Sequence, residues 1–175
     1  MLNLLNIMID LETTGTRAGC KILSLGACVF DREKIISEFY NKISVSSQDV
    51  YGLISDVDTM AWWSKQDALV SEEAFSGEDS LEFVLEQFVE WCPKSKGLLA
   101  WSCGADFDIP ILNHALAVCK HGWITPFWND RCYRTAKNIF KSVKPDARIG
   151  DHHNALDDAR YQALHLLKIY GVIRS

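Results

Sequence analysis

The sequence predicts an α/β domain built on a mixed β-sheet. The N-terminal part carries apolar or alternating segments separated by short polar turns, which is typical of an antiparallel meander. In the remainder, helical and strand patterns alternate, which indicates strand-helix-strand crossovers between parallel strands. The chain has 175 residues, the length of one domain, so we assign a single domain to residues 1–175.

Three N-terminal segments predict the antiparallel part of the sheet. Residues 2–9 form an apolar run that indicates a buried strand, and this strand is expected to end at two acids, Asp10 and Glu12. Residues 22–30 and 34–43 are apolar or alternating and contain many β-branched side chains, with a short polar turn between them. We therefore expect three consecutive strands that pair as a meander.

The middle of the chain predicts two helices. The clearest one covers residues 78–91, where apolar side chains recur at helical spacing, at Leu81, Val84, Leu85, Phe88 and Val89. Before it, Asp58 or Thr59 is positioned to cap a short helix that runs through Trp62 and Trp63.

The second half of the chain predicts the parallel part of the sheet and the helices that cover it. Residues 97–101 indicate a buried strand, and residues 107–121 a helix that must begin near Pro110, since proline is tolerated only in the first turn. One further short strand is expected before a short helix over residues 133–140, and a helix over residues 156–170 closes the chain. The prediction is thus a central mixed five-stranded sheet, three antiparallel strands followed by parallel ones, flanked by helices.

Composition and charge exclude several classes of function. Hydrophobic residues make up 48% and charged residues 23% of the chain, which is typical of a folded domain. The formal net charge of -5 argues against binding through a broad basic patch, so a polyanionic substrate would need a local site that holds cations. No C-x-x-C pair, signal peptide or membrane-spanning run is found, and we expect reduced cysteines and a cytoplasmic location.

Asp10 and Glu12 form the first cluster of chemically active residues. Residues i and i+2 of a strand point to the same face, so the two carboxylates are expected to project together. Like charges that close repel each other unless a proton or a cation joins them. A hard divalent cation such as Mg²⁺ or Mn²⁺ suits oxygen ligands. The alternative is that both acids are solvated loop residues.

Two further clusters stand at the starts of predicted helices. Asp106 and Asp108 follow the strand over residues 97–101, where α/β sheets place ligands; the alternative is that either aspartate caps the helix. His153 can accept a proton near neutral pH. On a regular helix it would lie about 140° from Asp158, so His153 is expected on the approach to the helix that carries Asp158. The alternative is that His152 and His153 are polar loop residues, and that Asp157 and Asp158 are favourable charges near the N-terminus of a helix.

In combination, these motifs resemble the DEDDh, or DnaQ-like, 3′-5′ exonuclease family of the ribonuclease H-like superfamily. The stretches that carry the resemblance are IDLETTG from Ile9, FDIPIL from Phe107 and HNALDDA from His153. It covers about residues 3–170 and is closest to the small phage and bacterial branch that includes the phage exonuclease DexA and the Rv-type exoribonuclease-like domains. The resemblance implies a ribonuclease H-like fold.

The resemblance also implies roles for individual residues. Two divalent cations, Mg²⁺ or Mn²⁺, would be held by four ligands, Asp10, Glu12, Asp108 and Asp158, and His153 would be the general base. Counted from His153, the family spacing H-x-x-x-x-D selects Asp158. Counted from His152, the same spacing selects Asp157, and the apolar stripe of the helix does not decide between the two aspartates.

The activity that the resemblance implies is metal-dependent 3′-5′ hydrolysis of single-stranded DNA or RNA to 5′-mononucleotides. The expected substrate contacts are Leu11, Thr13, Phe107 and Trp63, with core packing as the alternative for Trp62 and Trp63. Two other functions stand as alternatives: a catalytically silent nucleic-acid-binding or interaction domain on the same fold, and a two-metal endonuclease. The expected partners are nucleic-acid 3′ ends and no membrane; the resemblance and the six tryptophans favour a homodimer, with a monomer left open.

Overall fold

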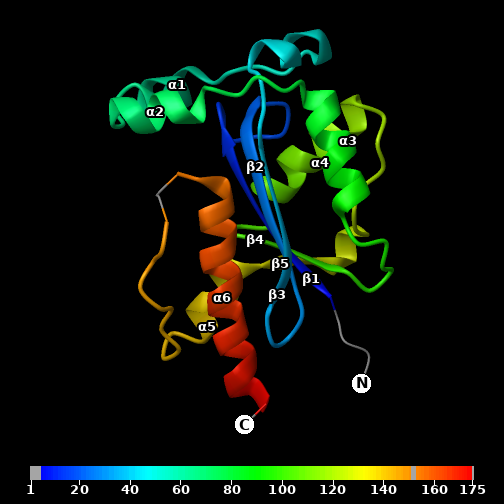
Figure 1. Cartoon of the computed structure of the whole chain (residues 1–175), viewed down its shortest axis with the longest axis vertical. Helices are drawn as coiled ribbons and strands as arrows, with labels where there is room; N and C mark the ends of the chain where they lie inside the picture. The colour runs from blue at the N-terminus through cyan, green and yellow to red at the C-terminus, as the bar shows by residue number, and fades with distance from the viewer. Residues whose placement is uncertain (1–4, 151–152, 175) are drawn as a thin grey trace.

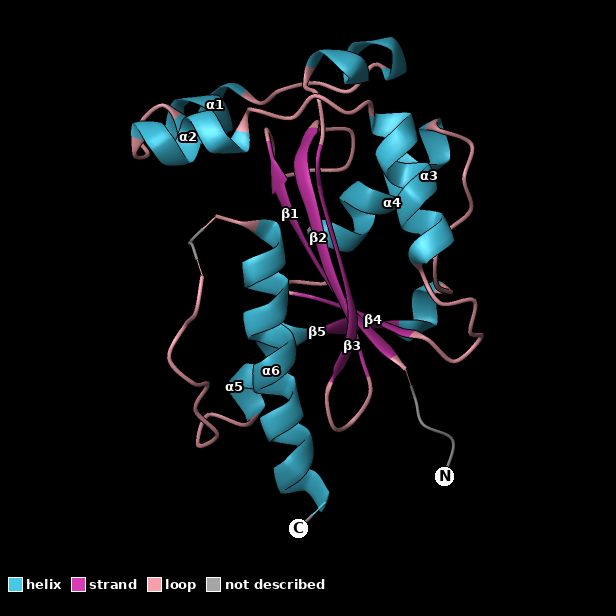
Figure 2. Cartoon of the chain, viewed as in Figure 1, coloured by secondary structure: helices cyan, strands magenta, loops and turns pink. Residues whose placement is uncertain are grey.

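The computed structural model describes residues 5–150 and 153–174, and within them the strands form one mixed sheet in the order β3-β2-β1-β4-β5 (Figures 1 and 2). The strands are β1 Asn6–Thr13, β2 Ile22–Phe30, β3 Ile35–Lys42, β4 Leu99–Ser102 and β5 Asp130–Cys132. β1 and β3 pair antiparallel with β2, whereas β4 pairs parallel with both β1 and β5. The structure therefore confirms the predicted fold class.

Helices cover both faces of this sheet. The helices of the described chain are α1 Val57–Trp63, α2 Ala68–Ala74, α3 Leu81–Trp91, α4 Asp108–Val118, α5 Tyr133–Ile139 and α6 Ala155–Arg174, with 3-10 helices η1 at Ser46–Tyr51 and η2 at Phe127–Asn129. In Figure 1, α5 and α6 lie on one face, α3 and α4 lie on the other, and α1 and α2 lie beyond the end of the sheet where β1 terminates. Among the described residues, no helix combines the length and apolar character needed to cross a membrane.

The alternation of side chains along β1 decides which face receives the two acids. Ile7 and Ile9 are fully buried in the core beneath α3 and α4. Met8 points the other way, into the core beneath α6. Asp10 and Glu12 continue the series of Met8, because every second residue of a strand shares a face. Both carboxylates therefore face α6.

The first strand ends one residue beyond the two acids at which it was expected to end. β1 continues through both acids to Thr13, because Asp10 pairs with Gly26 and Glu12 pairs with Ser24 in the ladder with β2. Residues 2–4 of the predicted strand lie outside the described residues. The ladder thus holds the backbone of both acids in place, which a loop would not do.

The region between β3 and α3 also differs from the prediction. The cap of α1 is Asp56, whose side chain accepts hydrogen bonds from the backbone N–H groups of Asp58 and Thr59. Helix α2 was not predicted; it has seven residues and is capped by Asp67. The other predicted helices are present, with their ends shifted by a few residues.

Helix α6 makes a very close approach to the sheet at Gly26 of β2. A Cβ atom built on Gly26 would lie 2.2 Å from backbone atoms of Ala155 and Leu156, so no side chain fits there. Gly26 is also the partner of Asp10 in the β1–β2 ladder. The missing side chain therefore lets the first turn of α6, which carries Asp158, lie over Asp10.

We predict that Gly26→Ala pushes α6 away from the sheet and lowers the free energy of unfolding by about 1–3 kcal/mol or more, as overpacked cores do. Urea unfolding measures the effect. The matched control is Gly122→Ala, because a Cβ there would meet nothing within 4 Å. Equal stability of the two variants would contradict the close approach of α6 to β2.

Candidate active site

Carboxylates from three segments meet in one small cavity at the end of β1. Asp10 and Glu12 come from β1, Asp108 from the first turn of α4 and Asp158 from the first turn of α6. The cavity has a volume of about 280 Å³, and its other lining residues are Leu11, Cys103, Phe107, His153 and Gln162. One ligand oxygen each from Asp10, Glu12 and Asp158 lie within 4.8 Å of one another, while Asp108 lines the same cavity outside this group.

Each of the three aspartates in the cavity has one oxygen held by a donor from this chain. The donors are the side-chain amide of Gln162 (2.8 Å to Asp10 Oδ1), the backbone N–H of Leu11 (3.1 Å to Asp108 Oδ1) and the guanidinium of Arg148 (2.5 Å to Asp158 Oδ1). Asp108 is not the N-cap of α4; that position is Phe107, which makes no side-chain capping hydrogen bond. These hydrogen bonds fix the orientation of the carboxylates before any ligand arrives.

Burial, and after it mutual repulsion, raises the pKa values of three carboxyls of the cluster, Asp10, Glu12 and Asp108. Burial raises the pKa of Asp10 well above its usual range, and the charges of Asp108 and Asp158 raise it further. The pKa of Glu12 rises to about 8, again chiefly by burial, while nearby Arg148 lowers it. Burial raises the pKa of Asp108 to about 7. Positive charge in the cavity, such as a bound cation, would favour the ionised form of these three groups.

The donor set suits a hard divalent cation, since carboxylate oxygens are the ligands that Mg²⁺ and Mn²⁺ prefer. Among the described residues, the buried side-chain polar atoms without a hydrogen-bond partner are Gln162 Oε1 and Arg148 Nε. Both belong to side chains that hold a carboxylate of the cluster. Buried polar atoms are rarely left unpaired, and Gln162 lines the cavity, so its free Oε1 fits a site that holds a further ligand.

His153 lies at the rim of the cavity, just before α6, as predicted from its spacing to Asp158. Its backbone adopts a φ of 64°, in the left-handed region that histidine tolerates better than most residues. The imidazole contacts the rings of Trp62 and Trp63 edge-on, with centroid distances of 5.2 and 6.1 Å. His153 also lines a second cavity, of about 810 Å³, together with residues of α2 and Tyr40.

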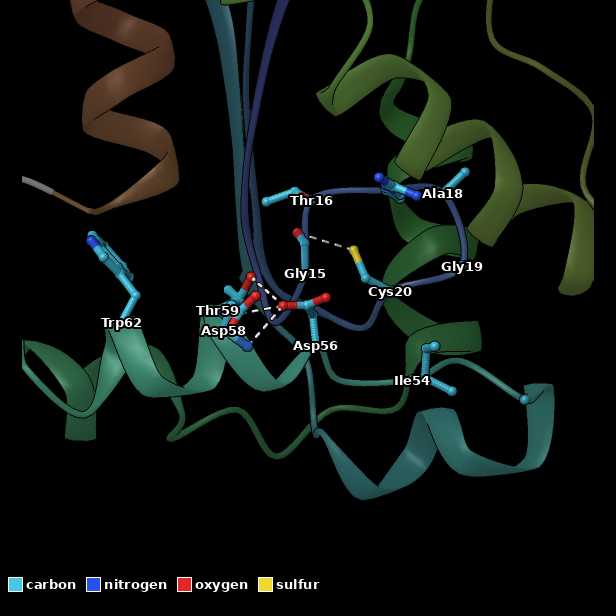
Figure 3. A pocket seen from close by; sticks show the side chains of 12 residues that line it. Gly15, Thr16, Ala18, Gly19, Cys20, Ile54, Asp56, Asp58, Thr59 and Trp62 are labelled. Atoms are coloured by element: carbon cyan, nitrogen blue, oxygen red, sulfur yellow. Dashed lines mark hydrogen bonds between the residues drawn. The ribbon is translucent and has the colours of Figure 1, made fainter.

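The two adjacent tryptophans have different environments. Trp63 is only 2% exposed, and its indole N–H donates a 2.9 Å hydrogen bond to the carbonyl of Thr13, so it is a core residue. Trp62 is 41% exposed. It stands at the edge of a cavity of about 950 Å³ between the loop that follows β1 and the start of α1 (Figure 3). This large cavity does not contain the carboxylates, and the contact between Trp62 and His153 connects the two regions.

The other predicted substrate contacts also differ in their access to the cavity. Leu11 is 4% exposed and Phe107 is partly buried, and both line the cavity of the carboxylates. Thr13 is buried, and its hydroxyl donates a 2.7 Å hydrogen bond to the carbonyl of Gly15.

Of the two neighbouring aspartates in α6, Asp158 joins the cluster. Asp157 instead pairs with Arg160 at 2.6 Å, and Arg160 also pairs with Glu38. His152, the alternative base, lies outside the described residues.

Two residues that hold the cluster together, Gln162 and Arg148, were not predicted from the sequence. Gln162 had a usable signal, because it follows Asp158 by four positions and shares its helix face. Nothing in the local pattern around Arg148 indicates that its side chain reaches Asp158.

Comparison with known proteins places this geometry in context. The family model described as the 3′-5′ exoribonuclease Rv2179c-like domain matches residues 5–170. No curated protein matches the chain in sequence.

Solved structures share the fold at low sequence identity. The nuclease domain of 3′hExo, a DEDDh family member, bound to rAMP, gives a TM-score of 0.66 at 13% identity and covers 98% of this chain and 94% of that one. Exonuclease X in complex with 5′ overhanging duplex DNA gives a TM-score of 0.61 at 17% identity, and the match covers 97% of this chain and 93% of that one. The structure of cell-death related nuclease 4 (CRN-4) gives a TM-score of 0.64 at 14% identity. The match covers 97% of this chain but only 64% of that longer protein.

We predict that the metal-free protein becomes less stable as the pH rises. Asp10, Glu12 and Asp108 have raised pKa values in the fold, about 7 for Asp108 and about 8 for Glu12, whereas carboxyl groups titrate near pH 4 in the unfolded chain. The folded state therefore binds more protons between about pH 4 and pH 8, and the free energy of unfolding falls across that range. Calorimetric unfolding with a chelator should show this fall, and Mg²⁺ should reduce it.

The variant Asp108→Asn tests the cause, because it carries no titratable group at that position. Its unfolding temperature should depend less on pH than that of the wild type, whereas Asp106→Asn, at an exposed position next to it, should keep the wild-type profile. Identical profiles for both variants would remove Asp108 from the explanation.

Proposed function

Because the chain belongs to the family of Rv2179c-like 3′-5′ exoribonuclease domains, and is thus a 3′-5′ exonuclease, we propose that it hydrolyses single-stranded nucleic acid by a two-cation mechanism with His153 as general base. The observation that carries this proposal is the convergence of Asp10, Glu12 and Asp158 within 4.8 Å, in a cavity that His153 also lines.

The proposed cation ligands are the four carboxylates of the cluster, Asp10, Glu12, Asp108 and Asp158. A bound pair of divalent cations would lower the pKa of an attacking water and offset the charge on the phosphoryl group. The raised carboxyl pKa values support this role, because cations would relieve the repulsion that raises them. The hydrogen bonds from Gln162 and Arg148 keep two of the ligands oriented toward the cavity.

In this mechanism, His153 takes a proton from the attacking water. The water oxygen then bonds to the phosphorus of the terminal phosphodiester, and the 3′ oxygen of the preceding nucleotide leaves with the electron pair of the broken bond. The product is a 5′-mononucleotide. The edge-on contact with Trp62 limits the rotation of the imidazole and so supports its role as a positioned base.

The proposed substrate is a single-stranded 3′ end. Leu11 and Phe107 would form walls for the terminal nucleotide, since both line the carboxylate cavity. Trp62 offers an exposed ring on which a base can stack, worth about 1–3 kcal/mol, and takes the place that sequence analysis gave to Trp63. A contact with Thr13 would use its oxygen as acceptor, because its hydroxyl proton is directed to a carbonyl.

The choice of RNA as first substrate follows the family description, which names an exoribonuclease. The structure of 3′hExo holds rAMP, whereas that of exonuclease X holds DNA with a 5′ overhang. We therefore propose RNA and test DNA beside it.

We predict that Asp158→Asn and Asp157→Asn separate by activity, although the two positions are adjacent. Asp158→Asn removes a proposed ligand and should lower kcat on 3′-end substrates by more than about 10²-fold, beyond the loss usual for residues that only orient a ligand. Asp157→Asn weakens a partly exposed pair with Arg160, outside the group of proposed ligands, and should stay within about twofold of wild type. Degradation of 5′-labelled RNA and DNA with Mn²⁺ measures both; equal losses would contradict the proposed ligand set.

We predict that His153→Ala lowers kcat by about 10²- to 10⁴-fold, the range usual for a positioned acid-base group. The KM for RNA should change much less, because the base acts on water and not on the nucleotide.

Circular RNA should stay uncut by the wild type. Cleavage of the circle would instead indicate an endonuclease.

A further inference from the structure

Gln162 lies one turn beyond Asp158 on the same face of α6 and lines the carboxylate cavity. Its side chain is 5% exposed, and Nε2 donates a 2.8 Å hydrogen bond to Asp10 Oδ1. A carboxylate that binds a cation is ionised and only accepts hydrogen bonds, so in a cation-bound site the amide nitrogen must face Asp10. The orientation of the amide is thereby fixed, and Oε1 is left to face another group.

Gln162 Oε1 is buried and has no hydrogen-bond partner among the described residues. The other fully buried glutamine, Gln48, provides the comparison. Its Oε1 accepts a hydrogen bond from the backbone N–H of Ile22 at 2.9 Å, and its Nε2 donates to the carbonyl of Ile22 at 2.7 Å. Both polar atoms of Gln48, which only supports the structure, thus form hydrogen bonds within the fold. The Oε1 atom of Gln162, in contrast, accepts no hydrogen bond from the described residues.

The chemistry of the cavity limits what that donor is. In a cation-bound site, the carboxylates that line the cavity with Gln162 are ionised and have no proton to give. A divalent cation held by Asp10, Glu12 and Asp158 would bring donors with it, since Mg²⁺ dehydrates reluctantly and usually keeps several waters. The O–H groups of those waters match a buried amide oxygen.

We propose that Gln162 is a positioning residue of the active site: Nε2 orients Asp10, and Oε1 accepts a hydrogen bond from the hydration water of a divalent cation. This inference rests on the proposed function. Side chains that orient metal ligands in this way usually change metal affinity or activity by about 10- to 100-fold when they are removed.

The test compares Gln162→Met with Gln48→Met in the full chain. Methionine keeps the length and the unbranched shape of glutamine but makes neither hydrogen bond, so both variants undergo the same chemical change in a buried environment. Calorimetric titration with Mn²⁺ alone should show about 10- to 100-fold weaker binding to Gln162→Met. Gln48→Met should unfold at a lower temperature but bind Mn²⁺ as the wild type does.

Kinetics gives a second readout. Gln162→Met should lower kcat and raise the Mn²⁺ concentration needed for half-maximal rate, with little change in the KM for RNA. If Gln162→Met does not fold, Gln162→Asn is measured instead; its amide is one methylene too short to reach Asp10, so Mn²⁺ binding should weaken in the same direction.

The outcomes separate this inference from the proposed function. Wild-type Mn²⁺ affinity in a folded Gln162→Met or Gln162→Asn variant overturns the role of Gln162 and leaves the nuclease proposal intact. Absence of Mn²⁺ binding to the wild type overturns both. Weaker Mn²⁺ binding to the variant, together with a wild type that degrades neither RNA nor DNA, overturns the proposed substrate and supports the role of Gln162.

Discussion

Repulsion among four carboxylates in one small cavity is the constraint around which this molecule is organised. All four carboxylates are favourable in water, and the fold buries Asp108 and partly buries Asp10, Glu12 and Asp158. Ionisation of these groups is therefore unfavourable, and the pKa values of Glu12 and Asp108 are raised. Hydrogen bonds from the chain offset part of this cost, and cations would offset the remainder.

The fold tolerates this repulsion because separate rigid elements hold the carboxylates. The ladder with β2 fixes the backbone of Asp10 and Glu12, and the two hydrophobic cores fix the sheet against helices on both faces. Gly26 then decides how near α6 comes, because only a residue without a side chain leaves room for the backbone of its first turn. A position in the sheet that carries no chemistry therefore sets the distance between Asp158 and Asp10.

Much of this arrangement could be predicted from the sequence where the signal is local. The period of two in a strand predicted that Asp10 and Glu12 share a face, and the phase of a helix predicted that His153 precedes α6. The end of β1 could not be predicted in this way, since the apolar run stops at the acids while the pairing with β2 continues. The pair Trp62 and Trp63 could not be resolved either, because packing against residues distant in the sequence, such as Leu23 and Ala74, decides which ring is buried.

The most direct test of cation binding at the carboxylate cluster is a crystal structure of the protein soaked with Mn²⁺, with the ions located by their anomalous scattering. Two peaks in the cavity, in contact with oxygens of Asp10, Glu12, Asp108 and Asp158, are the expected result. A cavity without peaks at Mn²⁺ concentrations that support nuclease activity, or ions bound only elsewhere on the molecule, would contradict it.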